Sequence, residues 1–148
     1  MNKKILIILL ISVTFICCVG KKTDKEIIEE LIDNVKTEIN NGNINILNKI
    51  IDNDYRDQYN RKKIEIINIV RNYLQTYSGL KVNVEGIKIK LKNNKADVEL
   101  SVYFTASNTS ILKKIMRKYT DKYRFLIELK KINKNWKVIY SEYEYSGI

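Results

Sequence analysis

Apolar residues recur every three to four positions in the first half of the chain, which is the period of helices with one buried face. Thr23 and Glu26 have the spacing of a capping box and predict a helix start, and Asn40–Gly42 predicts the end of that helix. A second, shorter helix is expected from Ile44 to about Asp52, before a polar turn over residues 52–57. The first third of the chain after Gly20 is therefore expected to be helical.

A third helix is expected after Asn60, whose side chain would cap its first turn. Ser78-Gly79 predicts the end of this helix. Its apolar stripe consists of Ile64, Ile67, Val70, Leu74 and Tyr77.

After Gly79 the apolar period changes to two, which predicts strands. The phase of the alternation slips at Glu85-Gly86, so we expect a β-bulge that bends the first strand. Polar turns at Lys92–Lys95 and Asn133–Asn135 predict hairpins. The expected strands cover residues 80–91, 96–104, 123–131 and 136–145, and residues 105–118 are left as a turn followed by a short helix. Three helices before a four-stranded meander predict an α+β fold with the helices on one face of a mainly antiparallel sheet.

The N-terminus has the pattern of an export signal, with basic Met1–Lys4 followed by the uncharged segment Ile5–Val19. As a helix, Ile5–Gly20 would cover roughly 24 Å, less than the hydrocarbon core of about 30 Å. Cys17 and Cys18 end the segment and resemble the lipobox of bacterial lipoproteins, in which a cysteine is lipidated and becomes the new N-terminus. Cys18 fits this pattern better than Cys17, because bulky Ile16 would directly precede Cys17.

These features predict a signal peptide over residues 1–17, a tether over 18–23 and one domain over 24–148. We expect a protein of the bacterial cell envelope, held at a membrane by its N-terminal lipid, with the domain outside the cytoplasm. An uncleaved apolar anchor and an ordinary cleaved signal are the alternatives.

The composition excludes several kinds of catalytic and metal site. The 148 residues fit one domain, and 27 Lys and Arg against 17 Asp and Glu give a net charge of +10. Without His, a Ser-His-Asp triad and a His-ligated zinc are excluded, and two adjacent Cys cannot form a disulfide framework or a four-cysteine metal site. We therefore expect neither a metal nor a cofactor.

Two segments resemble nuclear transport factor 2-like domains. Residues 41–55 are similar to the second-helix segment of that family, and residues 133–139, with Trp136 and Val138, to its last hairpin. The resemblance covers residues 24–146 and implies a strongly curved sheet that forms a cone with the helices around an apolar pocket. Some members are isomerases, epoxide hydrolases or cyclases, and many others only bind. Residues 55–57 and 123–125 also resemble a subgroup of uncharacterised bacterial lipoproteins.

An enzyme of this family would need an acid in the pocket. Alternation places Asp97, Glu99 and Glu128 on the opposite face, and they would point inward only if the phase of the sheet were reversed. None of the expected inward positions is acidic: they are Ala96, Val98, Leu100, Val102, Phe104, Phe125, Ile127 and Leu129. Asp54 and Asp57 lie where the pocket mouth is expected, or else they are turn-forming acids. We therefore assign no catalytic residue from the sequence.

Aromatic residues are the candidates for a ligand pocket, because their rings give apolar area and the Tyr hydroxyls orient a ligand. The alternative for these residues is ordinary packing, and for Trp136 a core position. The candidate pocket residues are Tyr55, Tyr59, Tyr73, Tyr77, Phe104, Phe125 and Trp136, and Tyr103, Tyr140 and Tyr143 are further Tyr of the sheet.

A basic stretch between the second and third strands would contact anionic lipid or be a solvated face. Its cations are Lys113, Lys114, Arg117 and Lys118. An exported protein has little access to nucleic acid, so we expect no nucleic-acid partner.

The predicted function is that of a lipid-anchored, non-enzymatic domain that binds an apolar small molecule or an envelope protein. One alternative is a small isomerase or hydrolase of the same fold that uses a pocket acid. A second is a structural subunit of an envelope assembly, with an apolar patch at Tyr103, Leu126 and Ile139 on the outer sheet face. The oligomeric state is left open.

Overall fold

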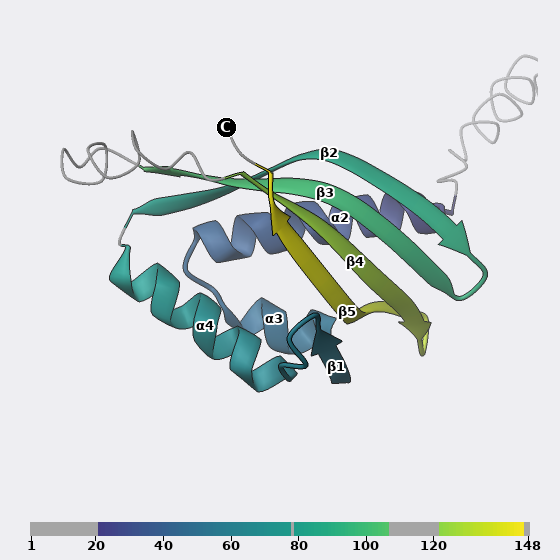
Figure 1. The fold of residues 1–148 in the computed structure, drawn as a ribbon. Coiled ribbons are helices and arrows are strands. Elements are labelled where there is room, and N and C mark those ends of the chain that lie inside the picture. The colour runs from purple at the N-terminus through teal and green to yellow at the C-terminus, as the bar shows by residue number, and fades with distance from the viewer. Residues whose placement is uncertain (1–20, 78, 107–121, 147–148) are drawn as a thin grey trace, which may run out of the picture.

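The computed structural model describes residues 21–77, 79–106 and 122–146. The helices lie on one side of a curved sheet (Figure 1). In chain order the elements are α2 (Asp24–Asn40), α3 (Asn45–Ile50), β1 (Ile51–Asp57), α4 (Lys63–Thr76), β2 (Leu80–Lys92), β3 (Lys95–Ala106), β4 (Lys122–Ile132) and β5 (Asn135–Tyr145). None of the helices within these ranges is long and apolar enough to cross a bilayer.

The sheet has five strands in the order β1-β5-β4-β3-β2 and is mixed, because β1 runs parallel to β5. The expected four-stranded sheet is therefore wrong, and so is the polar turn at residues 52–57. That segment is strand β1, in which Ile51, Tyr55 and Asp57 are buried. Apart from Ile51 and Tyr55 this strand is polar, so its sequence shows no apolar alternation, and its pairing with β5 is irregular between Ile51 and Arg56.

The predicted helix start is confirmed for α2 and wrong for α4. At α2, Thr23 and Glu26 form the expected capping box. At α4, the residue before the first turn is Lys62 and not the expected Asn60, which adopts a left-handed turn conformation with φ 61°. The Glu65 carboxylate accepts a hydrogen bond of 2.8 Å from the Lys62 amide instead. α3 ends at Ile50, earlier than expected, because the next residues pair with β5.

The antiparallel strands follow the expected pattern. The pairing of β2 with β3 shifts between Glu85 and Lys88, which confirms the predicted bulge, and Gly86 there has φ 65°. A side chain at this φ would be strained, so glycine suits the position. Both expected hairpins are present.

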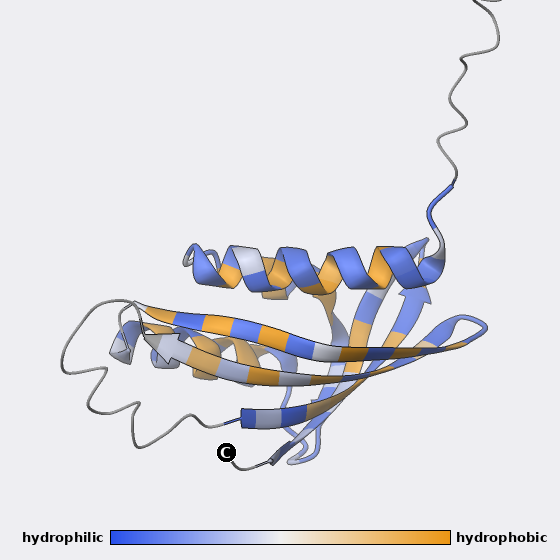
Figure 2. Cartoon of the chain, turned by 90° about the horizontal axis from the view of Figure 1, so that it is seen from above, coloured by the Kyte–Doolittle hydropathy of each residue, from blue (hydrophilic) through white to orange (hydrophobic). Residues whose placement is uncertain are grey.

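The buried residues form two clusters. The first, the α2 core, lies between α2 and the sheet and consists of Ile28, Ala96, Val98, Leu100, Leu129 and Trp136. The second, the β1 core, consists of Leu47, Ile51, Tyr55 and Ile67 from α3, β1 and α4. The coloured ribbon shows apolar residues along the side of α2 that faces the sheet (Figure 2). Because α2 accompanies the sheet while α3 and α4 gather at β1, the helices do not form one common layer on the sheet as expected (Figure 1).

Candidate functional site

A row of aromatic rings runs from α4 across β3, β4 and β5 on the sheet face that the helices cover. Tyr73 on α4 contacts Tyr77 at a centroid distance of 4.7 Å and Phe104 on β3 at 5.5 Å. Phe104 is 6.5 Å from Tyr123 on β4, and Tyr123 is 6.2 Å from Tyr143 on β5. These distances are typical of tilted and edge-to-face ring contacts. The rings therefore form one connected surface built from elements far apart in the sequence.

Three further rings join the row at β4 and β5. Phe125 stacks on Tyr143 at 5.4 Å, Tyr145 lies 5.8 Å from Tyr123, and Tyr59 lies 6.1 Å from Tyr143. We call these eight residues the aromatic row: Tyr59, Tyr73, Tyr77, Phe104, Tyr123, Phe125, Tyr143 and Tyr145. None of them is fully buried, and Tyr59, Tyr73 and Tyr145 are 61%, 42% and 57% exposed.

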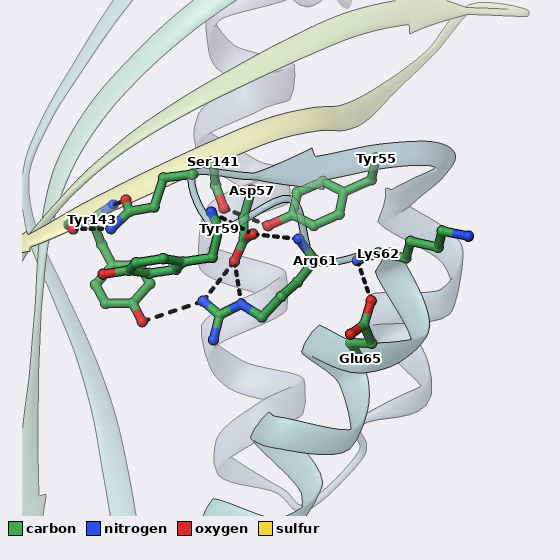
Figure 3. A network of polar contacts seen from close by, with 9 residues as sticks. Tyr55, Asp57, Tyr59, Arg61, Lys62, Glu65, Ser141 and Tyr143 are labelled. Atoms are coloured by element: carbon green, nitrogen blue, oxygen red, sulfur yellow. Dashed lines mark hydrogen bonds and ion pairs between the residues drawn. The ribbon is translucent and has the colours of Figure 1, made fainter.

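An ion pair between Asp57 and Arg61 lies at the β5 end of the row (Figure 3). The Asp57 side chain is almost fully buried. Its carboxylate accepts hydrogen bonds from the Arg61 Nε (2.6 Å), the Arg61 amide (2.8 Å) and the Tyr59 amide (3.0 Å). The carboxylate closes the turn between β1 and α4, so its role is to hold a loop.

The pKa of Asp57 reflects this environment. Burial alone would raise the pKa of the carboxyl, but the hydrogen bonds from the Arg61 side chain and from the two amides outweigh it, and the pKa lies below its ordinary value. The hydrogen bond to Asp57 raises the pKa of the Arg61 guanidinium further. Both groups are therefore charged at neutral pH.

The ion pair also positions two rings of the aromatic row. The Arg61 guanidinium lies 4.7 Å from the centroid of Tyr59 and donates a hydrogen bond of 3.3 Å to the Tyr143 hydroxyl. The Gln58 side chain bonds both the amide (2.6 Å) and the carbonyl (3.0 Å) of Tyr143. The turn after β1 thus fixes both the backbone and the ring of Tyr143 (Figure 3).

Two of the predicted pocket residues lie in the cores. Tyr55 is 2% exposed and its hydroxyl bonds the Ser141 Oγ at 2.6 Å. Burial raises the pKa of Tyr55. Trp136 belongs to the α2 core, as its alternative interpretation expected, and its indole Nε1 donates to Asp24 at 3.3 Å. The remaining predicted pocket residues, Tyr59, Tyr73, Tyr77, Phe104 and Phe125, come together in the aromatic row.

The candidate acids of the sheet lie on its outer face, as the alternation predicted. Asp97 pairs with Lys92 at 2.6 Å, and Glu99 pairs with Lys88 and Arg124 at 3.2 Å each. The hydrogen bonds from Arg124 and Lys88 lower the pKa of Glu99. Asp54 is exposed on β1. Among the described residues, no three acidic, Cys or His side chains are placed to hold a metal ion.

Clefts are present at two places on the described surface that bear on the site. One, of about 590 Å³, lies between α2, α3 and the β4–β5 turn, with Trp136, Ile27 and Lys134 among its lining residues. The other, of about 390 Å³, lies on the outer sheet face around Leu126 and Arg124. Neither is the apolar pocket expected between the helices and the inner sheet face. Cys17, Cys18 and the basic stretch Lys113, Lys114, Arg117 and Lys118 lie outside the described residues.

Solved structures with the same architecture identify the fold. The chain superposes on a protein from Cytophaga hutchinsonii described as NTF2-like, with a TM-score of 0.62 and 14% identity over 84% of this chain and 99% of that one. It also superposes on a nuclear transport factor 2 superfamily protein from Salmonella enterica, with a TM-score of 0.64 and 17% identity over 84% and 92% of the two chains. The fold is nuclear transport factor 2-like.

The similarity extends to a larger protein, Bd1075 from Bdellovibrio bacteriovorus, with a TM-score of 0.66 and 14% identity. This chain is covered over 81% but spans only 40% of Bd1075. No protein-family model and no curated protein matches the sequence. At these identities the comparisons establish the nuclear transport factor 2-like fold, which confirms that part of the predicted resemblance.

Sequence reasoning missed Gln58, Arg61 and Ser141, which shape the site around Tyr143. Only Arg61 could have been found from the sequence, because it follows Asp57 by four residues across a turn that Asn60 indicates. Gln58 and Ser141 act through pairing between β1 and β5, which local patterns do not reveal.

Proposed function

We propose that the chain is a lipid-anchored binding protein of a bacterial cell envelope, and that its nuclear transport factor 2-like domain binds an apolar, ring-containing small molecule without turnover. The observation that carries the binding part is the aromatic row. It offers connected ring surfaces on three neighbouring strands and α4, and three of its members are well exposed. Connected aromatic surface with exposed members is typical of a recognition site.

The chemistry of the row favours flat apolar ligands. Ring faces and edges provide contact area, while the hydroxyl of Tyr143, already fixed by Arg61, supplies an oriented polar group. Asp57 neutralises the Arg61 charge, so the site beside Arg61 does not require an anionic ligand.

Binding is favoured over catalysis because of how the nearby acid is held. A general base needs a carboxylate that can accept a proton from its substrate. The Asp57 carboxylate is buried, already accepts bonds from Arg61 and two amides, and has a lowered pKa. An isomerase or hydrolase would have to use a group other than Asp57.

The anchor rests on the N-terminal sequence, with its basic start, short apolar segment and terminal cysteine pair. Its test is metabolic labelling with a fatty-acid analogue in a bacterial host. We expect label on the wild type and on Cys17→Ser, and none on Cys18→Ser. Equal label on Cys18→Ser would refute lipidation at that residue.

The binding part is tested with the neutral fluorophore N-phenyl-1-naphthylamine and a fragment starting at Lys21, with circular dichroism to verify folding. We expect saturable fluorescence enhancement. Tyr73→Ala should weaken it roughly three- to tenfold, the range expected for one aromatic contact. Tyr103→Ala removes a ring from the opposite face of β3 and is the matched control. Equal effects of the two substitutions would refute the assignment of the row.

A further inference from the structure

Four lysines occupy adjacent register positions, one on each of four neighbouring strands, and one of them, Lys137, donates a hydrogen bond from its ammonium to the Lys49 carbonyl of α3. In the strand register Lys92 is opposite Lys95, Lys95 is opposite Lys130, and Lys130 is opposite Lys137. Residues directly opposite each other share a face, and their side chains are about 5 Å apart at Cβ. Like charges in such positions destabilise a sheet, so this row of cations is costly to the fold.

Acids are absent from this row but present in the next three rows. The next three rows of the outer face each carry two acids and one base: Lys90, Asp97, Glu128, Tyr140; Lys88, Glu99, Leu126, Glu142; and Glu85, Ser101, Arg124, Glu144. Cations in these three rows therefore have acids in the same row, whereas the lysine row at the end of the sheet has none. Lys92 has Asp97 as a partner, whereas no acid is opposite Lys95 or Lys130 in the described part of the chain.

The lysine row lies at the end where the chain leaves toward its N-terminus. Asp24, in the first turn of α2, accepts hydrogen bonds from Lys131 and Trp136 of the β4–β5 hairpin. The Lys131 amide bonds the Asn94 carbonyl in the β2–β3 turn at 2.8 Å. These contacts join the start of α2 to both hairpin turns, and both ribbon views place the α2 start beside the β2–β3 turn (Figures 1 and 2).

Further cations surround this point. Lys21 lies three residues before the start of α2, and Lys134 occupies the exposed β4–β5 turn. We call Lys21, Lys92, Lys95, Lys130 and Lys134 the lysine end.

We propose that the lysine end is a contact surface for anionic phospholipid, which holds the domain in one orientation on the membrane. The proposal rests on the anchor of the proposed function. From Cys18, residues 19–23 can span at most about 18 Å, so the start of α2 must stay near the bilayer. The lysine end would then face the headgroups, and their negative charge would offset the repulsion within the row.

Lysine footprinting on the full chain tests this. The protein is incorporated into vesicles of phosphatidylcholine, with or without phosphatidylglycerol, and briefly acylated, and modified lysines are quantified by mass spectrometry. We expect slower acylation of Lys95, Lys130 and Lys134 in the anionic vesicles. Raising the salt to 1 M, where the Debye length is about 3 Å, should abolish that protection. Lys62, just before α4, and Lys36, on α2, serve as internal references whose rates should not change.

A variant tests whether the row causes the protection. Lys95→Gln with Lys130→Gln should lower the equilibrium constant for membrane contact about 30-fold, because each surface lysine contributes roughly fivefold. Lys134 should then react as it does in neutral vesicles. The matched control, Lys62→Gln with Lys88→Gln, removes two cations elsewhere and should keep Lys134 protected.

Equal rates in both vesicle types, or protection of Lys62 and Lys36 instead, would overturn the proposal. Protection by soluble polyphosphate with none by vesicles would assign the row to a soluble polyanion and overturn it as well. The fatty-acid label on Cys18 is read separately, so a failed anchor is distinguishable from a failed contact surface.

Discussion

The α2 core and the β1 core are both buried, but they are held in different ways. The α2 core is filled by apolar side chains from one helix and three antiparallel strands. The β1 core sits beside polar contacts, with Tyr55 bonded to Ser141 and Asp57 bonded to Arg61 at the end of the same strand. Burial of apolar area is insensitive to pH, whereas a buried carboxylate must stay ionised and paired.

The difference determines what each region does. The α2 core supports the hairpin turns and with them the lysine end. The β1 core supports the turn that fixes Tyr143 in the aromatic row. Substitutions in the two cores should therefore differ in their pH dependence and in the surface that they disturb.

The largest effect is expected from Trp136→Ala in the α2 core. Trp136 is 4% exposed, and its loss leaves a cavity next to Asp24. We expect a loss of about 4 kcal/mol in the free energy of unfolding, measured by denaturant titration. Trp136→Phe keeps most of the buried area and should cost much less. A small effect of Trp136→Ala would mean that the α2 core does not depend on this ring.

Asp57→Asn is expected to cost about 3 kcal/mol at pH 7, because it leaves the Arg61 charge without its partner. The pKa of Asp57 is lowered in the folded protein, so its stabilisation is present above the ordinary pKa of 3.8 and is lost as pH falls further. The difference between wild type and Asp57→Asn should therefore shrink below pH 4. The loss from Trp136→Ala should shrink much less, because only its hydrogen bond to the Asp24 carboxylate depends on pH, while the loss of buried area does not. A pH-independent effect of Asp57→Asn would contradict the charged pair.

Tyr55→Phe probes the β1 core with a smaller change. It removes the hydroxyl that bonds Ser141 at 2.6 Å but keeps the buried ring. We expect a loss of about 1 kcal/mol. In the double variant with Ser141→Ala the second substitution should add little, since the bond is already gone. Tyr59→Phe, at an exposed ring, is the control and should be neutral. Fully additive losses at Tyr55 and Ser141 would contradict the bond.

How much the sequence predicts also differs between the two regions. Ala96, Val98, Leu100 and Leu129 were assigned to the inner face from alternation alone, because antiparallel strands with one buried face repeat every two residues. The start of α2 followed from the capping box at Thr23 in the same way. The α2 core could therefore be predicted mostly from local sequence patterns.

The β1 core was not predictable by these means. β1 reads as a polar segment, and it becomes a strand through parallel pairing with β5, more than 80 residues later. Asp57 is buried only because Arg61 and two amides satisfy it. For the site, the aromatic residue types were found from composition, but their order in the aromatic row needed the strand register.

The smallest effect is expected from relieving the repulsion at the lysine end, and it has the opposite sign. Lys95→Gln with Lys130→Gln removes two like charges that are directly opposite each other on β3 and β4. We expect stability to rise by about 0.5 kcal/mol at low salt. The gain should fall with added salt, because screening already weakens the repulsion in the wild type. The control, Lys62→Gln with Lys88→Gln, should give no gain, since Lys88 pairs with Glu99. A loss of stability at Lys95 and Lys130 would mean that the row is not strained, and it would remove the physical reason for an anionic partner there.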